Sequence, residues 1–330
     1  MANPEDLGRY RLKRLLGRGA LGEVWAADDL EEPGAKVAVK IMHAAEEELA
    51  LARIQFAREG RLASMLRHPN FVEIYDAGEA AGTSFLVMEL VEGRMLRAIL
   101  REGPPIAERL RWLGEVAEAL IALHRTGIIH RDLKPANVLV RADRSACLVD
   151  LGIAKWLKFD LGHIRDDDDM DFEPPTSQNL AAEYVPPETT DETIYDELSD
   201  QYAWGVLAYE TLTGHPPEPG AIPLSDRTDI PERFARAVDR ARMIDRDARF
   251  DGMESLLVEI GRKPSSAPPD EDTAVSRRYQ TSQLPPPPSI PVEDPSIEER
   301  LAPPDTTKRN VFIILALAIA IVALYVLMMR

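Results

Sequence analysis

The chain contains a single cysteine, Cys147, among its 330 residues, so it can form no disulfide within itself. An unpaired thiol is typical of proteins that work in a reducing compartment. Basic patches are also missing, and the net charge of -17 argues against binding of nucleic acid. The six histidines show no metal-ligand spacing, and residues 1 to 6 show no signal peptide. A content of 45% hydrophobic and 29% charged residues is instead typical of a soluble folded body.

The most informative segment is residues 130 to 137, which read His130-Arg131-Asp132-Leu133-Lys134-Pro135-Ala136-Asn137. A lone His-Arg-Asp triplet could be a solvated loop with a salt bridge, but the eight-residue pattern argues against that interpretation. The segment resembles the catalytic loop of a protein kinase. The resemblance implies that Asp132 accepts the substrate hydroxyl proton, Lys134 contacts the γ-phosphate and Asn137 binds a metal ion. Lys134 followed by Pro135 is the serine/threonine version of the pattern, and we expect His130 to pack beneath the loop.

A glycine-rich segment near the N-terminus reads Gly17-Arg18-Gly19-Ala20-Leu21-Gly22-Glu23-Val24 and fits G-x-G-x-x-G-x-V. Glycines let backbone N–H groups approach phosphates closely. A Rossmann turn carries a similar pattern but needs a helix next, whereas the following Val24-Trp25-Ala26-Ala27 favours a strand and a hairpin. In the kinase resemblance this segment covers the phosphates of ATP.

The alternation Val37-Ala38-Val39-Lys40 predicts a strand that ends in a lysine. The resemblance implies that Lys40 pairs with the α- and β-phosphates, although a surface lysine closing a strand would show the same pattern. Residues 44 to 66 have a helical composition, and Glu59 shares an apolar face of that helix. A carboxylate on an apolar face is costly without a partner, so we expect it to pair with Lys40.

Residues 85 to 93 resemble the last strand of the N-terminal lobe and the hinge that follows it. The resemblance implies that Met88 is the gatekeeper and that the backbone at Glu89 and Val91 binds adenine. Ordinary core filling would also account for Met88. Residues 147 to 152 form a strand that runs into Asp-Leu-Gly, a variant of the family's Asp-Phe-Gly, and Asp150 is implied as the second metal ligand.

Three further residues resemble structural parts of the kinase scaffold. Glu188, in Pro-Pro-Glu, stands where the family has Ala-Pro-Glu, and Arg249 matches the arginine that pairs with this glutamate. Asp200 resembles the aspartate that anchors the backbone of the catalytic loop.

The resemblance therefore assigns three sets of site residues. The catalytic set is Asp132, Lys134, Lys40 and Glu59. The ATP-binding set is Gly17, Arg18, Gly19, Ala20, Leu21, Gly22, Val24, Ala38, Lys40, Met88, Glu89 and Val91. The metal set is Asn137 and Asp150, the implied cofactor is Mg²⁺ or Mn²⁺, and ATP is a substrate.

The segment from 150 to 188 departs from the family pattern in two ways. Ala181 stands where the family usually has a threonine, so one hydroxyl that would contact Asp132 is missing. Residues 166 to 169 are four aspartates, which either form a solvated loop or imitate an activating phosphate that Arg131 would receive. Thr176 and Ser177 are candidate phosphorylation sites in the same segment.

The expected architecture is α+β, a two-lobed kinase fold at residues 10 to 262 after a tail at 1 to 9. The N-lobe is expected at about 10 to 91 and the helical C-lobe at about 92 to 262. Residues 263 to 310 form a predicted disordered linker, and residues 264 to 310 hold eleven of the chain's 26 prolines. Residues 311 to 329 are apolar throughout and, at about 28 Å of helix, predict a single membrane span. Lys308 and Arg309 favour a cytoplasmic kinase domain.

We expect a membrane-tethered serine/threonine protein kinase that acts in signalling on protein substrates and on itself. The alternatives are a pseudokinase scaffold, which Ala181 and the unusual segment favour, and a membrane adaptor that uses the proline-rich linker. Kinase dimerisation stays open, and no nucleic-acid partner is expected.

Overall fold

The computed structural model describes most of the first 263 residues. The described residues are 6–19, 22–42, 60, 63–80, 83–150, 182–190, 195–218 and 220–263. They belong to a compact unit that spans Met1–Leu284. Among these residues no helix has both the length and the apolarity needed to cross a bilayer, and the predicted span at 311 to 329 lies outside them.

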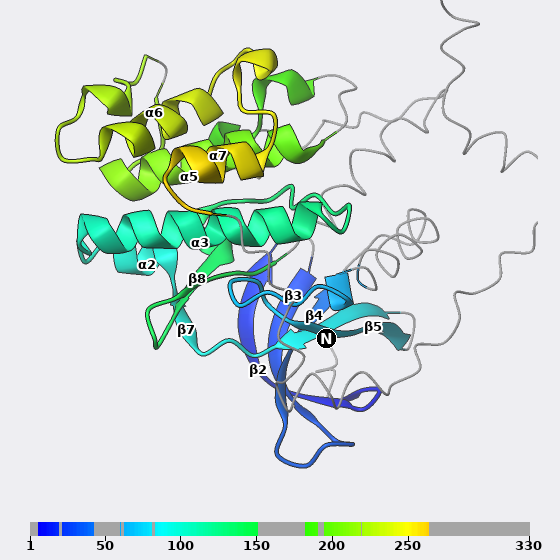
Figure 1. Cartoon of the computed structure of the whole chain (residues 1–330). Coiled ribbons are helices and arrows are strands. Elements are labelled where there is room, and N and C mark those ends of the chain that lie inside the picture. The colour runs from blue at the N-terminus through cyan, green and yellow to red at the C-terminus, as the bar shows by residue number, and fades with distance from the viewer. Residues whose placement is uncertain are drawn as a thin grey trace, which may run out of the picture. The chain divides into compact units, whose positions relative to one another are not determined.

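Six strands form an antiparallel sheet in the N-terminal lobe, drawn from blue to cyan in Figure 1. They are β1 (Asp6–Leu7), β2 (Tyr10–Gly19), β3 (Gly22–Asp29), β4 (Lys36–Met42), β5 (Ile74–Ala80) and β6 (Thr83–Glu89). Their order in the sheet is β1-β2-β3-β4-β6-β5. The hairpin predicted for the glycine-rich segment is confirmed, because β2 and β3 pair from Tyr10 opposite Asp29 to Gly19 opposite Gly22.

The side chains of strand β4 alternate between the two faces of the sheet, as the alternation of its sequence predicts. Val37, Val39 and Ile41 are buried in a cluster whose described members all lie on strands. Ala38 is buried in a second, larger cluster that also contains the helices of the C-terminal lobe. Because successive side chains of a strand point to opposite faces, Lys40 lies on the same face as Ala38. The alternation therefore turns Lys40 toward the larger cluster.

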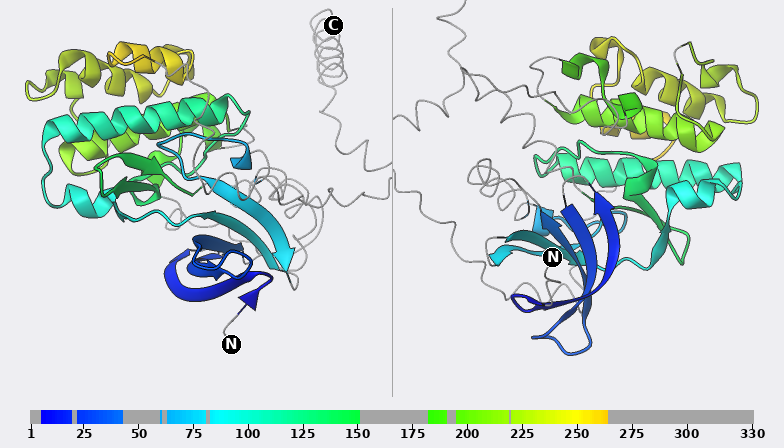
Figure 2. Two further views of the ribbon diagram at one scale, coloured as in Figure 1. Left: turned by 60° about the horizontal axis from the view of Figure 1, so that its bottom comes forward. Right: turned by 180° about the vertical axis from the view of Figure 1, so that it is seen from behind.

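The C-terminal lobe is mainly helical (Figures 1 and 2). Its helices are α2 (Leu96–Leu100), α3 (Ile106–His124), α5 (Glu197–Thr213), α6 (Glu232–Ala241) and α7 (Met253–Glu259), with short 3-10 turns η2 (Pro135–Asn137), η3 (Ala182–Tyr184), η4 (Pro187–Thr190), η5 (Leu224–Asp226) and η6 (Arg246–Ala248). A small sheet of order β7-β8-β9 lies beside α3 and consists of β7 (Gly93–Met95), β8 (Val138–Arg141) and β9 (Ala146–Leu148).

Helix α5 has defined ends and a fixed place against α3. Asp196 and Ser199 form a reciprocal capping box at its start, and Gly214 ends it with a φ of 94° that favours glycine. The fully buried Trp204 donates from Nε1 to the carbonyl oxygen of Leu113 in α3 at 3.0 Å. This hydrogen bond fixes the position of α5 along the axis of α3.

The two lobes are joined next to β9. The backbone N–H of Leu148 donates to the carbonyl oxygen of Asn70 at 2.7 Å, and the N–H of Val72 donates to the carbonyl oxygen of Leu148 at 2.9 Å. These two bonds fix the strand that leads into Asp150 against the chain that leads into β5.

A buried ion pair stabilises the C-terminal lobe, as the sequence predicts. Arg249 donates from Nη1 and Nη2 to the two carboxylate oxygens of Glu188 at 2.6 and 2.7 Å. The side chain of Arg249 is 0% exposed and also donates to the carbonyl oxygens of Leu198 and Met243. One arginine therefore ties residue 188 to the start of α5 and to the loop after α6.

Replacing Arg249 should strongly destabilise the fold. In Arg249→Met the carboxylate of Glu188 loses its cation, and removing one partner of a buried pair costs about 3 to 5 kcal/mol. We expect the free energy of unfolding, measured by urea denaturation of the purified chain, to fall by that amount. The matched control is Arg236→Ala, which breaks an exposed pair with Glu232 and should cost less than about 1 kcal/mol. Equal losses in the two variants would contradict this account of Arg249.

Candidate active site

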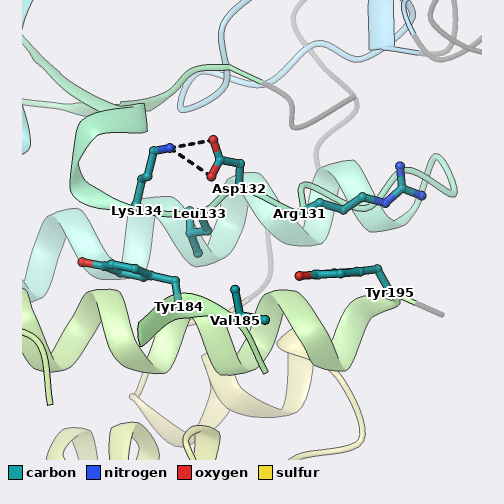
Figure 3. A pocket seen from close by; sticks show the side chains of 7 residues that line it. All are labelled: Arg131, Asp132, Leu133, Lys134, Tyr184, Val185 and Tyr195. Atoms are coloured by element: carbon teal, nitrogen blue, oxygen red, sulfur yellow. Dashed lines mark hydrogen bonds and ion pairs between the residues drawn. The ribbon is translucent and has the colours of Figure 1, made fainter. Parts of the chain in front are cut away.

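Three polar residues of the loop between α3 and β8 converge, as Figure 3 shows for two of them. Lys134 Nζ lies 3.0 and 2.8 Å from Oδ1 and Oδ2 of Asp132. Asn137 donates from Nδ2 to the carbonyl oxygen of Asp132 at 2.7 Å and to its Oδ2 at 3.0 Å. The carboxylate of Asp132 is thus oriented by a cation and an amide, both supplied by the same loop.

Asp200 of α5 holds the backbone of this loop by two hydrogen bonds. Its Oδ2 accepts from the backbone N–H of His130 at 2.7 Å, and its Oδ1 accepts from the N–H of Arg131 at 2.9 Å. Arg131 has a φ of 65°, a backbone conformation that non-glycine residues rarely adopt. The predicted anchoring role of Asp200 is therefore confirmed, and it holds a loop residue in a conformation that costs energy.

A histidine completes the surroundings of Asp200. Nε2 of His124 lies 2.8 Å from Oδ2 of Asp200, and both side chains are buried. Burial alone would raise the pKa of Asp200, but the hydrogen bond and charge of His124 lower it overall. Burial alone would likewise lower the pKa of His124, and the bond to Asp200 raises it overall. The two groups therefore stabilise each other in their charged forms.

His130 lies fully buried beneath the loop, as the sequence analysis expects. Burial lowers its pKa, which favours the neutral imidazole. Its Nδ1 accepts from the backbone N–H of Asp132 at 3.3 Å. His130 therefore supports the position of Asp132.

Lys40 and Asp150 meet across the two lobes. Lys40 Nζ forms a hydrogen bond and ion pair with Oδ1 of Asp150, and the two side chains are 14% and 35% exposed. Asp150 follows β9 and has a φ of 68°. The N–H of Val149 donates to the backbone carbonyl oxygen of Asn137 at 2.9 Å, so the chain that carries Asp150 is bonded to the loop that carries Asp132. The predicted site residues Lys40, Asp132, Asn137 and Asp150 are therefore connected in one site.

A profile of the protein kinase domain matches residues 10–251 of this chain. The chain belongs to the protein kinase family. It is 36% identical over 276 residues to serine/threonine-protein kinase pkn2 of Myxococcus xanthus, and this match covers 82% of the present chain and 32% of pkn2. It is 34% identical over 312 residues to serine/threonine-protein kinase PknH of Mycobacterium tuberculosis, and this match covers 88% of the present chain and 47% of PknH. This kinase thus spans about a third to a half of the length of these two relatives.

Solved structures agree with this assignment. The crystal structure of the Mycobacterium tuberculosis PknI kinase domain matches with a TM-score of 0.60 and 26% identity over 79% of this chain and 98% of that chain. The PpkA-294 apo form matches with a TM-score of 0.65 at 20% identity, covering 79% of this chain and 98% of that chain, which shows a shared fold alone. The expected kinase fold, with a strand-rich N-lobe and a helical C-lobe, is confirmed, and so is the resemblance to bacterial serine/threonine kinases.

The predicted ATP-binding residues on three strands of this kinase share one face of the sheet. Val24 lies opposite Lys40 in the β3–β4 pairing, and Ala38 lies opposite Met88 in the β4–β6 pairing. Residues directly opposite each other in antiparallel strands project to the same face. Ala38 and Met88 are 5% and 6% exposed. A flat apolar surface of this kind suits the faces of a purine ring.

A side chain cannot fit at Gly22 of the glycine-rich hairpin. A Cβ atom on Gly22 would lie 2.0 Å from the carbonyl oxygen of Ile41, and Gly22 has a φ of 153°. The kinase backbone at this point therefore requires glycine. Gly17 and Gly19 lie in β2, and the side chain of Arg18 pairs with Glu23 at 2.7 Å.

The residues predicted to hold a metal ion have suitable chemistry. Asn137 offers an amide oxygen and Asp150 a carboxylate, and oxygen atoms are the ligands that Mg²⁺ prefers. This ion is usually bound by one or two protein groups together with the phosphates of the substrate. The two-residue set of this kinase therefore fits the Mg-ATP that its family uses.

A small pocket beside Asp132 includes residues that the sequence analysis did not assign. It is lined by Arg131, Asp132, Leu133, Lys134, Tyr184, Val185 and Tyr195 (Figure 3). Tyr184 stands three residues after Ala181, at the tyrosine of the family's Gly-Thr-x-x-Tyr pattern, so that motif could have identified it. Tyr195 carries no comparable sequence signal.

Several predictions fall outside the described residues. Glu59, Ala20, Leu21, Thr176, Ser177, Ala181 and the aspartates at 166 to 169 are among them. The pairing of Glu59 with Lys40 and the regulatory hypothesis therefore stay predictions. The side chain of Arg131 extends away from Asp132 in Figure 3.

The pair of His124 and Asp200 should make the stability of this kinase depend on pH. A histidine whose folded-state pKa is raised stabilises the fold fully below its unfolded value of about 6.5, and the effect is lost as the pH rises through the folded-state pKa. His124→Gln keeps an N–H donor but cannot be protonated. We expect the stability lost in this variant, measured by urea denaturation, to be larger at pH 6 than at pH 9. The control is His215→Gln, at an exposed histidine. A loss of stability in His124→Gln that grows as the pH rises would contradict the raised pKa of His124.

Proposed function

We propose that this chain is an active serine/threonine protein kinase that transfers the γ-phosphoryl group of Mg-ATP to hydroxyls of protein substrates and of itself. The observation that carries the proposal is the position of Asp132 between Lys134 and Asn137, in the same site as the pair of Lys40 and Asp150. The names of the relatives, which are serine/threonine-protein kinases, support the choice of acceptor.

Each side chain has a role that its geometry allows. Asp132 takes the proton of the acceptor hydroxyl while the hydroxyl oxygen forms a bond to the γ-phosphorus. The bond between this phosphorus and the oxygen it shares with the β-phosphate breaks, and ADP leaves. Lys134 stabilises negative charge on the transferred group, and Lys40 orients the α- and β-phosphates. Magnesium, bound through Asn137 and Asp150, would neutralise charge on the phosphates.

The second candidate is a pseudokinase that binds nucleotide or protein partners without catalysis. It is favoured by Ala181, which lacks the hydroxyl of the usual threonine, and by the four aspartates that follow residue 165. One neutral hydrogen bond is worth about 0.5 to 1.5 kcal/mol, which would slow phosphoryl transfer without abolishing it. The active enzyme is favoured by the residues that the structure brings together, which are Lys40, Asp132, Lys134, Asn137 and Asp150.

Replacing Asp132 tests catalysis directly. Asp132→Asn keeps the shape of the side chain but removes the base, so turnover should fall by about 10² to 10⁴ while ATP affinity is kept. The measurement is transfer of labelled γ-phosphate to a generic protein substrate, with ATP affinity measured separately. Asp143→Asn, on the exposed turn between β8 and β9, is the matched control and should retain full activity. A wild-type chain that binds ATP but transfers no phosphate would establish the pseudokinase.

We further propose that residues 311 to 329 anchor the kinase in a membrane, with the catalytic domain in the cytosol. The run of nineteen residues has no charge, glycine or proline. Its length as a helix suits a bilayer core, and Lys308 and Arg309 precede it on the side of the kinase domain. The proline-rich segment before it would act as a spacer.

Deleting residues 311 to 330 should release an active kinase from membranes. A charge at the centre of the span, Ala318→Arg, should disfavour insertion by about 2.5 to 3.5 kcal/mol, whereas Ala318→Leu should insert normally. The measurement is the fraction of full-length protein that stays with membranes after alkaline extraction. Wild-type chain recovered in the soluble fraction without detergent would contradict the anchor, and this result is independent of catalytic activity.

A further inference from the structure

The hinge between the two sheets of this kinase is short and closely packed. It begins at Glu89, where β6 ends, and finishes at Gly93, where β7 begins. The backbone N–H of Glu89 donates to the carbonyl oxygen of Glu73 at 2.8 Å. At the other end, a Cβ atom on Gly93 would lie 2.7 Å from the carbonyl oxygen of Val140. The hinge therefore lies directly against β8.

Arg141 of β8 contacts both ends of this hinge. Its backbone is paired with Gly93 in the antiparallel β7–β8 ladder. Its guanidinium forms a bidentate ion pair with Glu89, in which Nη2 lies 2.9 Å from Oε2 and Nη1 donates a hydrogen bond to Oε1. One residue thus closes the hinge into a loop, through its backbone at one end and through its side chain at the other.

The surroundings of Arg141 restrict the guanidinium to this position. The side chains of Arg141 and Glu89 are 23% and 26% exposed, so water screens the pair only in part. Nη2 also lies 3.2 Å from Sγ of the buried Cys147 on β9. The backbone N–H of Arg141 donates to the carbonyl oxygen of Ser145 at 2.9 Å, which fixes the turn that carries it. A planar guanidinium that binds a carboxylate through two bonds also defines the orientation of its partner.

A neighbouring ion pair offers a direct comparison. Arg94 and Glu102 also form a bidentate ion pair, and Arg94 follows Gly93 in β7. Their side chains are 56% and 57% exposed, and Glu102 lies outside the hinge. This pair has the same chemistry as the pair at Arg141 but does not connect the two ends of the hinge.

We propose that Arg141 is a positioning residue for the nucleotide, because it fixes the hinge backbone at Glu89 and Val91 in the conformation that binds adenine. The inference rests on the proposed function, in which this backbone binds the base of ATP. A hinge that is ordered before binding loses less conformational freedom when the nucleotide arrives, so its affinity is higher. The γ-phosphate and Asp132 belong to the other part of the site. Arg141 should therefore affect the affinity for the adenosine moiety and leave the transfer step unchanged.

The test is binding and kinetics of the full-length chain with Arg141→Met, Arg141→Lys and Arg94→Met. Arg141→Met removes the cation and keeps a long apolar stem. We expect the Kd for Mg-ATP and the Kd for adenosine to rise together, roughly fivefold to tenfold, as for the loss of a partly buried charged pair. The Kd for inorganic tripolyphosphate should not change. The KM for ATP should rise with the Kd while kcat stays within about twofold.

Two comparisons make the result specific to the pair. Arg141→Lys, which keeps the charge but binds through one atom, should restore part of the affinity, and Arg94→Met should bind as wild type does. Glu89→Gln should reproduce the effect of Arg141→Met, and the double variant should be no weaker than either single variant. If Arg141→Met does not fold, as judged by its thermal transition, Glu89→Gln provides the same test from the other side of the pair.

The outcomes separate this inference from the proposed function. Wild-type chain that binds neither ATP nor adenosine would overturn the proposed function and, with it, the role of Arg141. Wild-type chain that binds both, with Arg141→Met and Glu89→Gln binding equally well, would overturn the inference alone. Equal losses in Arg141→Met and Arg94→Met, or a fall in kcat with unchanged Kd, would also overturn it.

Discussion

The site of this kinase depends on one buried carboxylate, that of Asp200. Its side chain is fully buried, and an isolated charge there would cost several kcal/mol. Two backbone N–H groups and His124 offset that cost, and the place of Asp200 near the start of α5 adds the favourable end of the helix dipole. Because both N–H groups belong to the catalytic loop, the energy that keeps the charge buried also determines the path of that loop.

The remaining parts of the site are each fixed by a different kind of interaction. Asn70 and Val72 hold β9 by backbone hydrogen bonds, and Asp150 follows that strand. Sheet pairing places Ala38 and Met88 on one face, and packing against the larger apolar cluster keeps that face inside. Arg249 and Glu188 hold the chain that carries Tyr184 beside Asp132. The site thus combines hydrogen bonding, sheet register, apolar burial and several ion pairs.

Much of this arrangement could be predicted from the sequence, because the motifs encode local chemistry in a fixed order. Asp132, Lys134 and Asn137 lie within one short loop, so their spacing alone brings them together. The anchoring role of Asp200 and the pairing of Glu188 with Arg249 followed from the family resemblance. The contact between Lys40 and Asp150 was not predicted, since it depends on how two lobes approach each other over 110 residues of chain.

Other features had no sequence signal. The cation that pairs with Glu89 comes from β8, 52 residues later in the chain, and the periodicity of the two strands does not predict this contact. Tyr195 lines the pocket and directly precedes Asp196, the N-cap residue of α5. Such contacts arise from tertiary packing, and single-sequence patterns describe only the faces that pack.

The alternation along β4 also bears on how reliably this sheet assembles. If β4 paired one residue out of register, Lys40 would enter the cluster that buries Val39, and Val39 would take its place above the site. The slipped sheet would contain an ammonium group in an apolar interior, which is much more costly than a poorly fitted methyl group. The lysine that the proposed chemistry needs thus also serves folding fidelity, because it penalises the incorrect register of its own strand.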